Sequence, residues 1–354
     1  MRCTPVMGLQ SAAVRIRLKD VATLAGVSEA TVSRVMNRKD GVAPATKAEV
    51  LRVLAELGYE PPGLHDAPRA GSIGLIVPEL GNPVFPALAQ ALEARLLASG
   101  YLSILCCASR ATATEDDYVE TLVRQSAAGI IIVSGRHADI GGDHTIYHDL
   151  VDRGMPLVLV NGQVPGSNIP TVSTDDRTAT IAAYNHLAAL GHERIGLLIG
   201  PLCYVPVVRK VEGFRAAAAN AGVGADVAER RISESMYSVE GGYAGAQDLL
   251  DAGVTAIVAA SDMMALGAIR AVRERGLDVP DDVSVVGYDD TDLMRFTDPP
   301  LTTVRQPVLQ IAELAASLLI AQITGQRVEQ QEFLVHGELI GRSSAAGLSV
   351  AAPV

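Results

Sequence analysis

The 354-residue chain contains no tryptophan, 4% aromatic residues and four cysteines. No two cysteines have the C-x-x-C spacing, so neither a zinc site nor a disulfide framework is indicated. No stretch approaches the roughly 20 apolar residues of a membrane span. Residues 1–16 lack the continuous apolar segment of a signal peptide. These absences predict a cytoplasmic protein without a membrane partner, whose residues 1–16 are a disordered leader or follow a misassigned start codon.

Aliphatic residues dominate what is present. Hydrophobic residues make up 49% of the chain, and 33 glycines accompany them. A chain of this length exceeds one typical domain of about 100–200 residues. Aliphatic, aromatic-poor sequences are typical of helices packed on parallel sheets. We therefore predict the α/β class, in two or three domains.

Charge is unevenly distributed along the chain. Residues 1–63 carry a net charge of +3, whereas the whole chain carries −11, which leaves −14 for residues 64–354. Because phosphates repel an acidic surface, any nucleic-acid contact belongs to the first sixty residues.

The segment from Leu18 to Asn37 predicts two short helices joined by a tight turn. Val21, Ala22 and Leu24–Ala25 form an apolar stripe on the first helix. Gly26 supplies the turn, and the next serine, Ser28, is placed to cap the second helix. Val32 and Val35–Met36 give that helix a buried face, and a third helix is predicted over Thr46–Leu57.

Short or fork-shaped hydrogen-bonding side chains occupy the outer surface of the second helix, which suits a major groove. Arg34 is able to form a bidentate bond to a guanine edge, worth about 1–3 kcal/mol of discrimination. Thr31, Ser33 and Asn37 are able to bind DNA phosphates, and such contacts fix the register of the helix on the duplex. The alternative is a solvated face without a partner. The surface comprises Glu29, Ala30, Thr31, Ser33, Arg34 and Asn37.

These residues resemble the DNA-binding domain of the lactose/galactose repressor (LacI/GalR) family. The resemblance rests on Asp-Val-Ala, Ala-Gly-Val-Ser and Thr-Val-Ser-Arg-Val within 20–37, followed by Leu57-Gly-Tyr59-x-Pro61. It implies that Glu29 and Ala30 select sequence, that Arg34 reads a base and that Tyr59 packs beneath the reader. Together with Leu64 of the following linker, the predicted DNA-binding set is Lys19, Ser28, Glu29, Ala30, Thr31, Ser33, Arg34, Asn37, Tyr59 and Leu64.

The linker departs from the family's pattern. Family members continue with a helix whose leucine wedges into the minor groove, but here residues 61–72 are about three residues short and contain Pro68. Proline breaks a helix because it lacks an N–H and its ring clashes with the preceding turn. Leu64 is the one large apolar side chain left to act as a wedge. A minor-groove contact by Leu64 and a flexible linker both remain open.

From residue 73, short apolar runs alternate with helical stretches, which predicts parallel sheets covered on both faces. Two such sheets would form a cleft at the carboxyl ends of their strands, where open α/β folds bind ligands. The pattern resembles a periplasmic-binding-protein clamshell. The predicted strands are Ile73–Val77, Leu102–Cys107, Ile130–Val133, Leu157–Val160, Ile195–Ile199, Ala256–Ala259 and Val283–Gly287.

The family resemblance extends to about residue 347. It rests on stretches that include Ile73-Gly-Leu-Ile-Val-Pro78, Gly213-Phe214 and Val286-Gly-Tyr-Asp-Asp290. The predicted organisation is a leader (1–16), a helix-turn-helix domain (17–60), a linker (61–72), an effector domain (73–347) and a tail (348–354). Within the effector domain, we assign 73–173 and 305–335 to an N-lobe, and 174–304 and 336–347 to a C-lobe.

A cleft that binds a polyol requires guanidinium groups and carboxylates, because each hydroxyl is both a donor and an acceptor. A polar group left unpaired after desolvation costs roughly 1–3 kcal/mol. Arg209 and Asp289 fall at the family's effector positions, although a structural ion-pair role is the alternative for both. Ser261 replaces an asparagine of many sugar-binding members, which leaves the sugar class open. The predicted effector-binding set is Asn82, Phe85, Asn161, Arg209, Ser261 and Asp289.

One loop suggests a metal site, and its side chains suit zinc or manganese. Gly141-Gly142 within it favours a solvated loop, where aspartate and histidine act as turn and cap residues. We therefore predict no metal and no cofactor. The residues concerned are His137, Asp139, Asp143, His144, His148 and Asp149.

No nucleophile elbow, phosphate-binding loop or intact dinucleotide motif follows a predicted strand, so we predict no enzyme activity.

The sequence predicts a homodimeric repressor that binds a palindromic operator, with helices over 84–99 and 308–325 pairing the subunits. Its operator affinity would be controlled by a small effector, a sugar or sugar derivative. The alternative is a solute-binding receptor without DNA-binding function. The helix-turn-helix segment favours the regulator.

Overall fold

The computed structural model describes residues 18–36, 42–43, 46, 49–50, 52–54, 71–108, 113–329 and 331–347. The chain divides into two compact units, Met1–Arg69 and Ala70–Val354. The predicted leader, most of the linker and the tail lie outside the described residues.

The first unit contains two short helices and part of a third. Helix α1 spans Leu18–Leu24 and α2 spans Glu29–Met36. Residues 46, 49–50 and 52–54 are also helical. The core that joins them is aliphatic and consists of Val21, Ala22, Val32, Val35, Val50, Val53 and Leu54.

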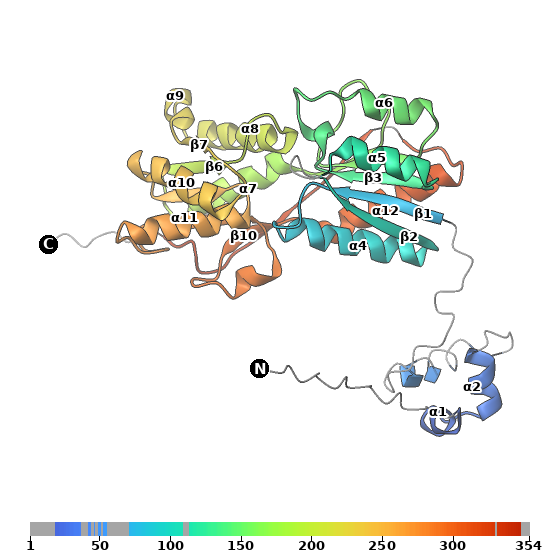
Figure 1. Cartoon of the computed structure of the whole chain (residues 1–354). Coiled ribbons are helices and arrows are strands. Elements are labelled where there is room, and N and C mark those ends of the chain that lie inside the picture. The colour runs from blue at the N-terminus through green and yellow to red at the C-terminus, as the bar shows by residue number, and fades with distance from the viewer. Residues whose placement is uncertain are drawn as a thin grey trace, which may run out of the picture. The chain divides into compact units, whose positions relative to one another are not determined.

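The second unit has two lobes, each built on a six-stranded sheet (Figure 1). The N-lobe sheet is parallel throughout, in the order β11-β5-β4-β3-β1-β2. Its strands are β1 (Gly71–Val77), β2 (Tyr101–Cys107), β3 (Gly129–Val133), β4 (Leu157–Val160), β5 (Thr171–Thr174) and β11 (Glu332–Val335). Its helices are α4 (Val84–Ala98), α5 (Glu115–Arg124), η1 (Arg136–Ala138), α6 (Thr145–Asp152) and α12 (Val308–Ile323).

Alternation along the N-lobe strands sorts its side chains into two cores, one on each face of the sheet. Ile73 and Leu75 pack with α4 and α12, whereas Ile76 packs with α5 and α6. Because successive strand residues point to opposite faces, a sheet buried on both faces requires apolar residues at nearly every position. The four isoleucine and valine residues of 130–133 meet this requirement, and all are fully buried.

The C-lobe sheet has the order β12-β10-β9-β8-β6-β7, and β12 alone is antiparallel to its neighbour. Its strands are β6 (Ile195–Ile199), β7 (Ile232–Glu234), β8 (Ala256–Ala259), β9 (Ser284–Asp289), β10 (Thr302–Arg305) and β12 (Glu338–Ile340). Its helices are α7 (Asp176–Ala189), α8 (Val205–Asn220), α9 (Ala225–Glu229), α10 (Val239–Asp251), α11 (Asp262–Glu274) and η2 (Asp292–Arg295).

The chain passes between the lobes three times. It leaves the N-lobe sheet after β5, returns between β10 and α12, and crosses again between β11 and β12. Three neighbouring crossovers form a hinge between two separately packed cores. The predicted fold class, a helix-turn-helix unit with a two-lobed α/β domain, is confirmed.

Candidate functional site

The turn between α1 and α2 is fixed by local residues. Gly26 has φ +64°, a left-handed conformation that other residues seldom adopt. The Ser28 hydroxyl then accepts a hydrogen bond from the Thr31 amide at 3.1 Å, which satisfies one of the free N–H groups at the start of α2. Val32 and Val35 are buried on the opposite side of α2. The cap and the buried face together set which side of α2 remains outside.

The outward side of α2 carries the predicted DNA-binding residues. Ser28, Glu29, Ala30 and Arg34 are exposed, whereas Thr31 and Ser33 are half-buried. Lys19 is exposed on α1. Leu24 departs from the predicted apolar stripe, because it is 60% exposed at the end of α1. Three further residues of the predicted set, Asn37, Tyr59 and Leu64, lie outside the described residues.

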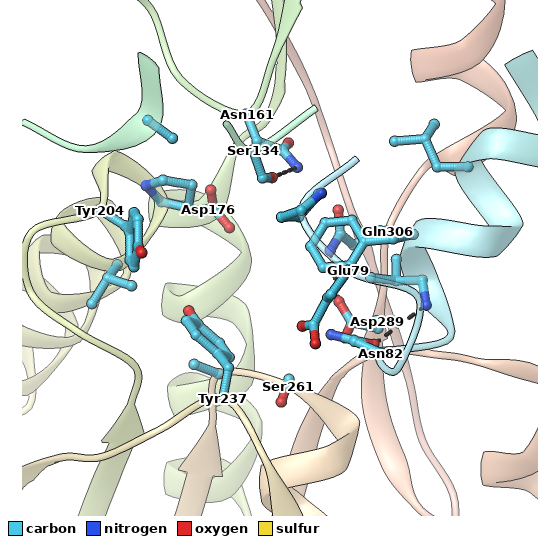
Figure 2. A pocket seen from close by; sticks show the side chains of 18 of the residues that line it. Glu79, Asn82, Ser134, Asn161, Asp176, Tyr204, Tyr237, Ser261, Asp289 and Gln306 are labelled. Atoms are coloured by element: carbon cyan, nitrogen blue, oxygen red, sulfur yellow. Dashed lines mark hydrogen bonds between the residues drawn. The ribbon is translucent and has the colours of Figure 1, made fainter. Parts of the chain in front are cut away.

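A cavity of about 520 Å³ lies between the two lobes. Figure 2 shows side chains from several elements directed into this space. The cavity adjoins the carboxyl ends of the strands, where ligands bind in open α/β sheets. Its polar lining consists of Glu79, Asn82, Ser134 and Asn161 from the N-lobe, Gln306 from a crossover, and Asp176, Tyr204, Lys210, Tyr237, Ser261 and Asp289 from the C-lobe.

Five of the six residues predicted to bind the effector line this cavity. They are Asn82, Phe85, Asn161, Ser261 and Asp289. Ser261 also caps α11, since its hydroxyl accepts from the Met264 amide at 3.2 Å. Ser261 therefore lines the cleft and also caps α11, so its replacement would remove the cap as well.

Arg209 does not line the cavity, which departs from the prediction. Its guanidinium donates to both carboxylate oxygens of Glu332, at 2.8 Å and 2.6 Å. This bidentate pair joins α8 of the C-lobe to β11 of the N-lobe. Two guanidinium N–H groups of Arg209 thus donate to Glu332 of the other lobe. This contact matches the structural ion pair that was the alternative interpretation of Arg209.

The next residue, Lys210, does line the cavity. Its ammonium forms an ion pair with Asp176 and lies 4.0 Å from the centre of the Tyr288 ring. The Tyr288 hydroxyl donates to the same Asp176 oxygen atom, Oδ1, at 2.7 Å. Lys210 and Asp176 side chains are 6% and 4% exposed. A buried charge requires such partners, because desolvation alone is costly.

Asp289 lies where both lobes and a crossover meet. Its carboxylate accepts from Gln306 Nε2 at 2.6 Å and from Asn82 Nδ2 at 3.4 Å. Burial raises the pKa of Asp289 well above its usual value, and the nearby Asp262 carboxyl raises it further. The Gln306 carbonyl in turn accepts from the Thr174 hydroxyl at 3.0 Å. A ligand that engages Asp289 therefore contacts a hydrogen-bond chain that links both lobes.

The backbone is strained where the strands enter the cavity. Ser134, Asn161 and Asp289 have φ values of 45°, 67° and 123°. Non-glycine residues in such conformations cost on the order of 1–3 kcal/mol each, and they persist where surrounding contacts enforce them. All three follow or end a strand and line the cavity. This clustering supports a binding role for the strand ends.

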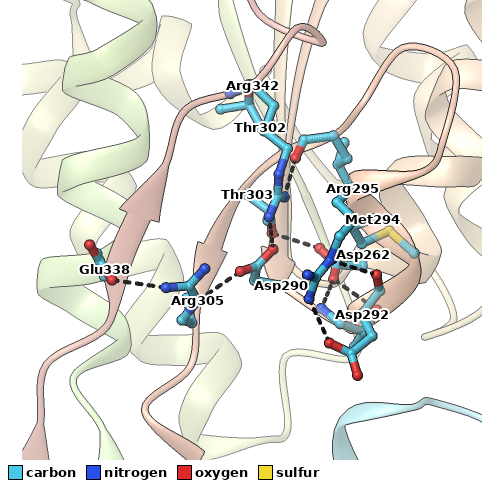
Figure 3. A network of polar contacts seen from close by, with 12 residues as sticks. Asp262, Asp290, Asp292, Met294, Arg295, Thr302, Thr303, Arg305, Glu338 and Arg342 are labelled. Atoms are coloured by element: carbon cyan, nitrogen blue, oxygen red, sulfur yellow. Dashed lines mark hydrogen bonds and ion pairs between the residues drawn. The ribbon is translucent and has the colours of Figure 1, made fainter.

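A polar network holds the strands behind Asp289 together (Figure 3). Asp290 pairs with Arg305 at 2.8 Å and with Arg342 at 2.6 Å. Asp262 accepts from the Thr303 hydroxyl at 2.6 Å and the Thr291 amide at 2.8 Å. These contacts join β9, β10 and the segment after β12, so the network fixes the position of Asp289.

Several lining residues were missed by the sequence analysis. Ser134 follows β3 as Asn161 follows β4, so strand position was a usable signal. Tyr237 follows β7, a three-residue strand too short to be recognised from its sequence. Lys210 and Asp176 are 34 residues apart and offered no local signal. Glu79 follows the first strand, β1, and was not singled out.

The histidine- and aspartate-rich loop uses its side chains in turns and packing. His137 is fully buried, and its Nε2 is 3.0 Å from the Val160 carbonyl oxygen. Burial lowers the pKa of His137 to about 4. Asp143 accepts from the Thr145 amide at 3.0 Å, as a helix-start residue does. Within the described ranges, no group of three or more His, Cys, Asp or Glu is arranged to hold a metal ion.

Comparison with known proteins identifies the family. Residues 17–62 match the model for bacterial regulatory proteins of the lacI family, and residues 184–345 match a periplasmic binding protein-like domain. The transcriptional regulator MalR of Streptomyces coelicolor is 49% identical over 332 residues, which cover 93% of this chain and 96% of MalR. The chain belongs to the lacI family. This LacI-family regulator matches its relative over nearly the full length of both.

Solved structures of the same family share the fold. The regulator CelR in complex with cellobiose has 32% identity and a TM-score of 0.69, over 94% of this chain and all of CelR. A lac repressor dimer bound to operator and the anti-inducer ONPF has 28% identity and a TM-score of 0.68, over 94% and 99% of the two chains. No helix in the described part of this LacI-family chain is long and apolar enough to cross a membrane.

Proposed function

We propose that this LacI-family chain is a sequence-specific transcriptional repressor of the cytoplasm, whose operator affinity is controlled by a small effector held between the lobes. One observation carries the proposal: the chain that presents the exposed polar face of α2 also contains a cavity lined by polar groups from both lobes. A solute receptor would need the cavity alone. The lacI-family match over residues 17–62 therefore favours the repressor.

We infer that the repressor acts as a homodimer on a palindromic operator. Two copies of α2 would occupy successive major grooves about one helical turn apart. Exposed leucines support pairing through the N-lobe: Leu97 on α4 is 48% exposed, Leu105 on β2 is 49% exposed and Leu309 on α12 is 69% exposed. Effector binding changes operator affinity only as far as the effector distinguishes the two lobe arrangements.

The DNA-binding half of the proposal is tested by Arg34→Ala. The loss of a bidentate base contact should lower the affinity for a selected operator by about tenfold or more, while effector affinity is unchanged. Exposed Arg230 on the C-lobe provides a charge-matched control, and Arg230→Ala should leave both affinities intact. Equal loss of operator and effector binding in Arg34→Ala would count against separate sites.

The effector half is tested by Asp289→Ala. This variant should bind the operator with wild-type affinity and no longer respond to the effector, because the carboxylate at the meeting point of the lobes is gone. Fluorescence anisotropy with labelled operator measures both properties. An unchanged effector response would remove Asp289 from the site.

A further inference from the structure

Glu79 is an acidic residue of the cavity that has no partner among the residues that the structure describes. It follows β1 after Pro78, lines the cavity and is half-buried. Figure 2 shows its side chain directed into the space beside Asn82. In the part of the chain that the structure describes, its carboxylate has no hydrogen bond and no ion pair. Partial burial raises the pKa of Glu79, and no neighbouring charge offsets this effect.

An unpaired, partly desolvated carboxylate favours a ligand that brings hydrogen-bond donors. Removal of water from a charged group is unfavourable unless new hydrogen bonds replace those to water. A carboxylate accepts through two oxygens and provides no donor when ionised. Neighbouring hydroxyls of a sugar ring would satisfy both oxygens at once.

The ionisable side chains of the cavity disfavour an anionic ligand. The ionisable acids of its lining are Glu79, Asp176 and Asp289, and its one lysine or arginine is Lys210. Lys210 is already paired with Asp176 and stacked on Tyr288. A phosphate placed here would therefore meet carboxylates without a free cation, and repulsion at short range disfavours such contacts.

The remaining lining suits an uncharged carbohydrate. Phe85, Tyr204 and Tyr237 bring aromatic rings to the cavity, and such rings pack against the apolar face of a sugar. Ser134, Asn161 and the other amide and hydroxyl groups supply both donors and acceptors. A cationic ligand would satisfy the carboxylates, but these mixed groups match hydroxyls better.

We propose that Glu79 binds effector hydroxyls directly, and that it selects an uncharged sugar over its phosphorylated form. This inference rests on the proposed function, since it assigns a residue and a ligand class to the same cavity. Glu79 would be the N-lobe counterpart of Asp289, so a bound sugar would donate hydroxyl hydrogen bonds to an acidic side chain from each lobe.

Isothermal titration calorimetry with maltose, cellobiose and the 6-phosphate of each tests this assignment on the full-length chain. The wild type should bind at least one neutral disaccharide at least tenfold more tightly than its phosphate. Glu79→Gln should weaken the neutral sugar about tenfold or more, because charge-assisted hydrogen bonds are lost. The same substitution should strengthen the phosphate about three- to tenfold, because a repulsive charge is removed.

Glu93→Gln is the matched control, since Glu93 is exposed on α4 outside the cavity lining. It should leave every affinity unchanged. Equal or tighter wild-type binding of a phosphate would overturn the charge selection, and an unaltered sugar affinity in Glu79→Gln would overturn the direct contact. Failure of both neutral sugars to bind would overturn the proposed ligand class. The proposed function fails separately, if the wild type does not bind a selected operator.

Discussion

Arg209 of the C-lobe and Glu332 of the N-lobe form a bidentate ion pair across the lobes. Glu332 Oε1 also accepts from the Ser173 hydroxyl at 2.6 Å. The pair is therefore hydrogen-bonded to β5, the strand that precedes the first crossover. The two side chains are 23% and 12% exposed, which shields them from solvent. Any motion that separates α8 from β11 must break this pair.

A double-mutant cycle with Arg209→Ala and Glu332→Ala measures its strength. We expect a coupling free energy of about 1–3 kcal/mol in the free energy of unfolding, because charge-assisted bidentate bonds with restricted solvent access are the stronger ones. Urea denaturation of the four proteins provides the measurement. The exposed Arg215–Glu229 pair, 52% and 58% exposed, is the control and should couple by less than about 1 kcal/mol. Equal coupling in the two pairs would contradict a bridging role.

Asp262 predicts a pH dependence of stability. Burial raises the pKa of Asp262 to about 6, although hydrogen bonds from Thr303 and Thr291 oppose this shift. The folded state thus binds this proton more tightly than the unfolded state, whose carboxyl titrates near its ordinary value of about 4. The free energy of unfolding should therefore fall as pH rises from about 4 to about 6, by no more than about 3 kcal/mol.

The measurement is urea unfolding of the wild type and Asp262→Asn between pH 4 and pH 8. Asparagine does not titrate, so the variant should lack this part of the downward slope, whatever its absolute stability. Parallel curves for the two proteins would show that Asp262 has an ordinary pKa in the folded state.

Helices α10 and α11 approach each other so closely at Gly267 that no larger residue fits there. A Cβ atom at this position would overlap the Val239 carbonyl and the Tyr243 amide on α10. Backbone atoms cannot move aside as a side chain can, so Gly267→Ala should lower the free energy of unfolding by about 1–3 kcal/mol or more. Gly341→Ala is the control, because nothing lies within 4 Å of a Cβ there. Thermal unfolding distinguishes the two, and equal melting temperatures would refute the close approach.

The sequence predicted the elements whose signal is local. The α1–α2 turn follows from a glycine with positive φ and a serine cap, and both act within a few residues. Strands such as β3 and β4 were recognised because burial on both faces demands an unbroken apolar run. By contrast, β5 (Thr171–Thr174) and β10 (Thr302–Arg305) were missed as strands, because their four threonines are polar, although all four are buried in the sheets.

The lining of the cavity was only partly predictable. Asp289 and Asn161 lie at strand ends, a position that the order of elements indicates. Glu79 was not singled out, since an acidic residue in a turn gives no sign of whether the folded chain supplies it with a partner.

By itself, the sequence determined the fold class, helix α2 with its cap, and the strand ends that form a cleft, because hydrophobic periodicity and capping act over short distances. Only the tertiary structure decided that Arg209 pairs with Glu332, 123 residues away, and leaves the cavity to Lys210 and its partner Asp176. The reason is physical: a charged side chain takes the partner that folding brings within hydrogen-bond distance, and that choice depends on how two separately packed lobes meet.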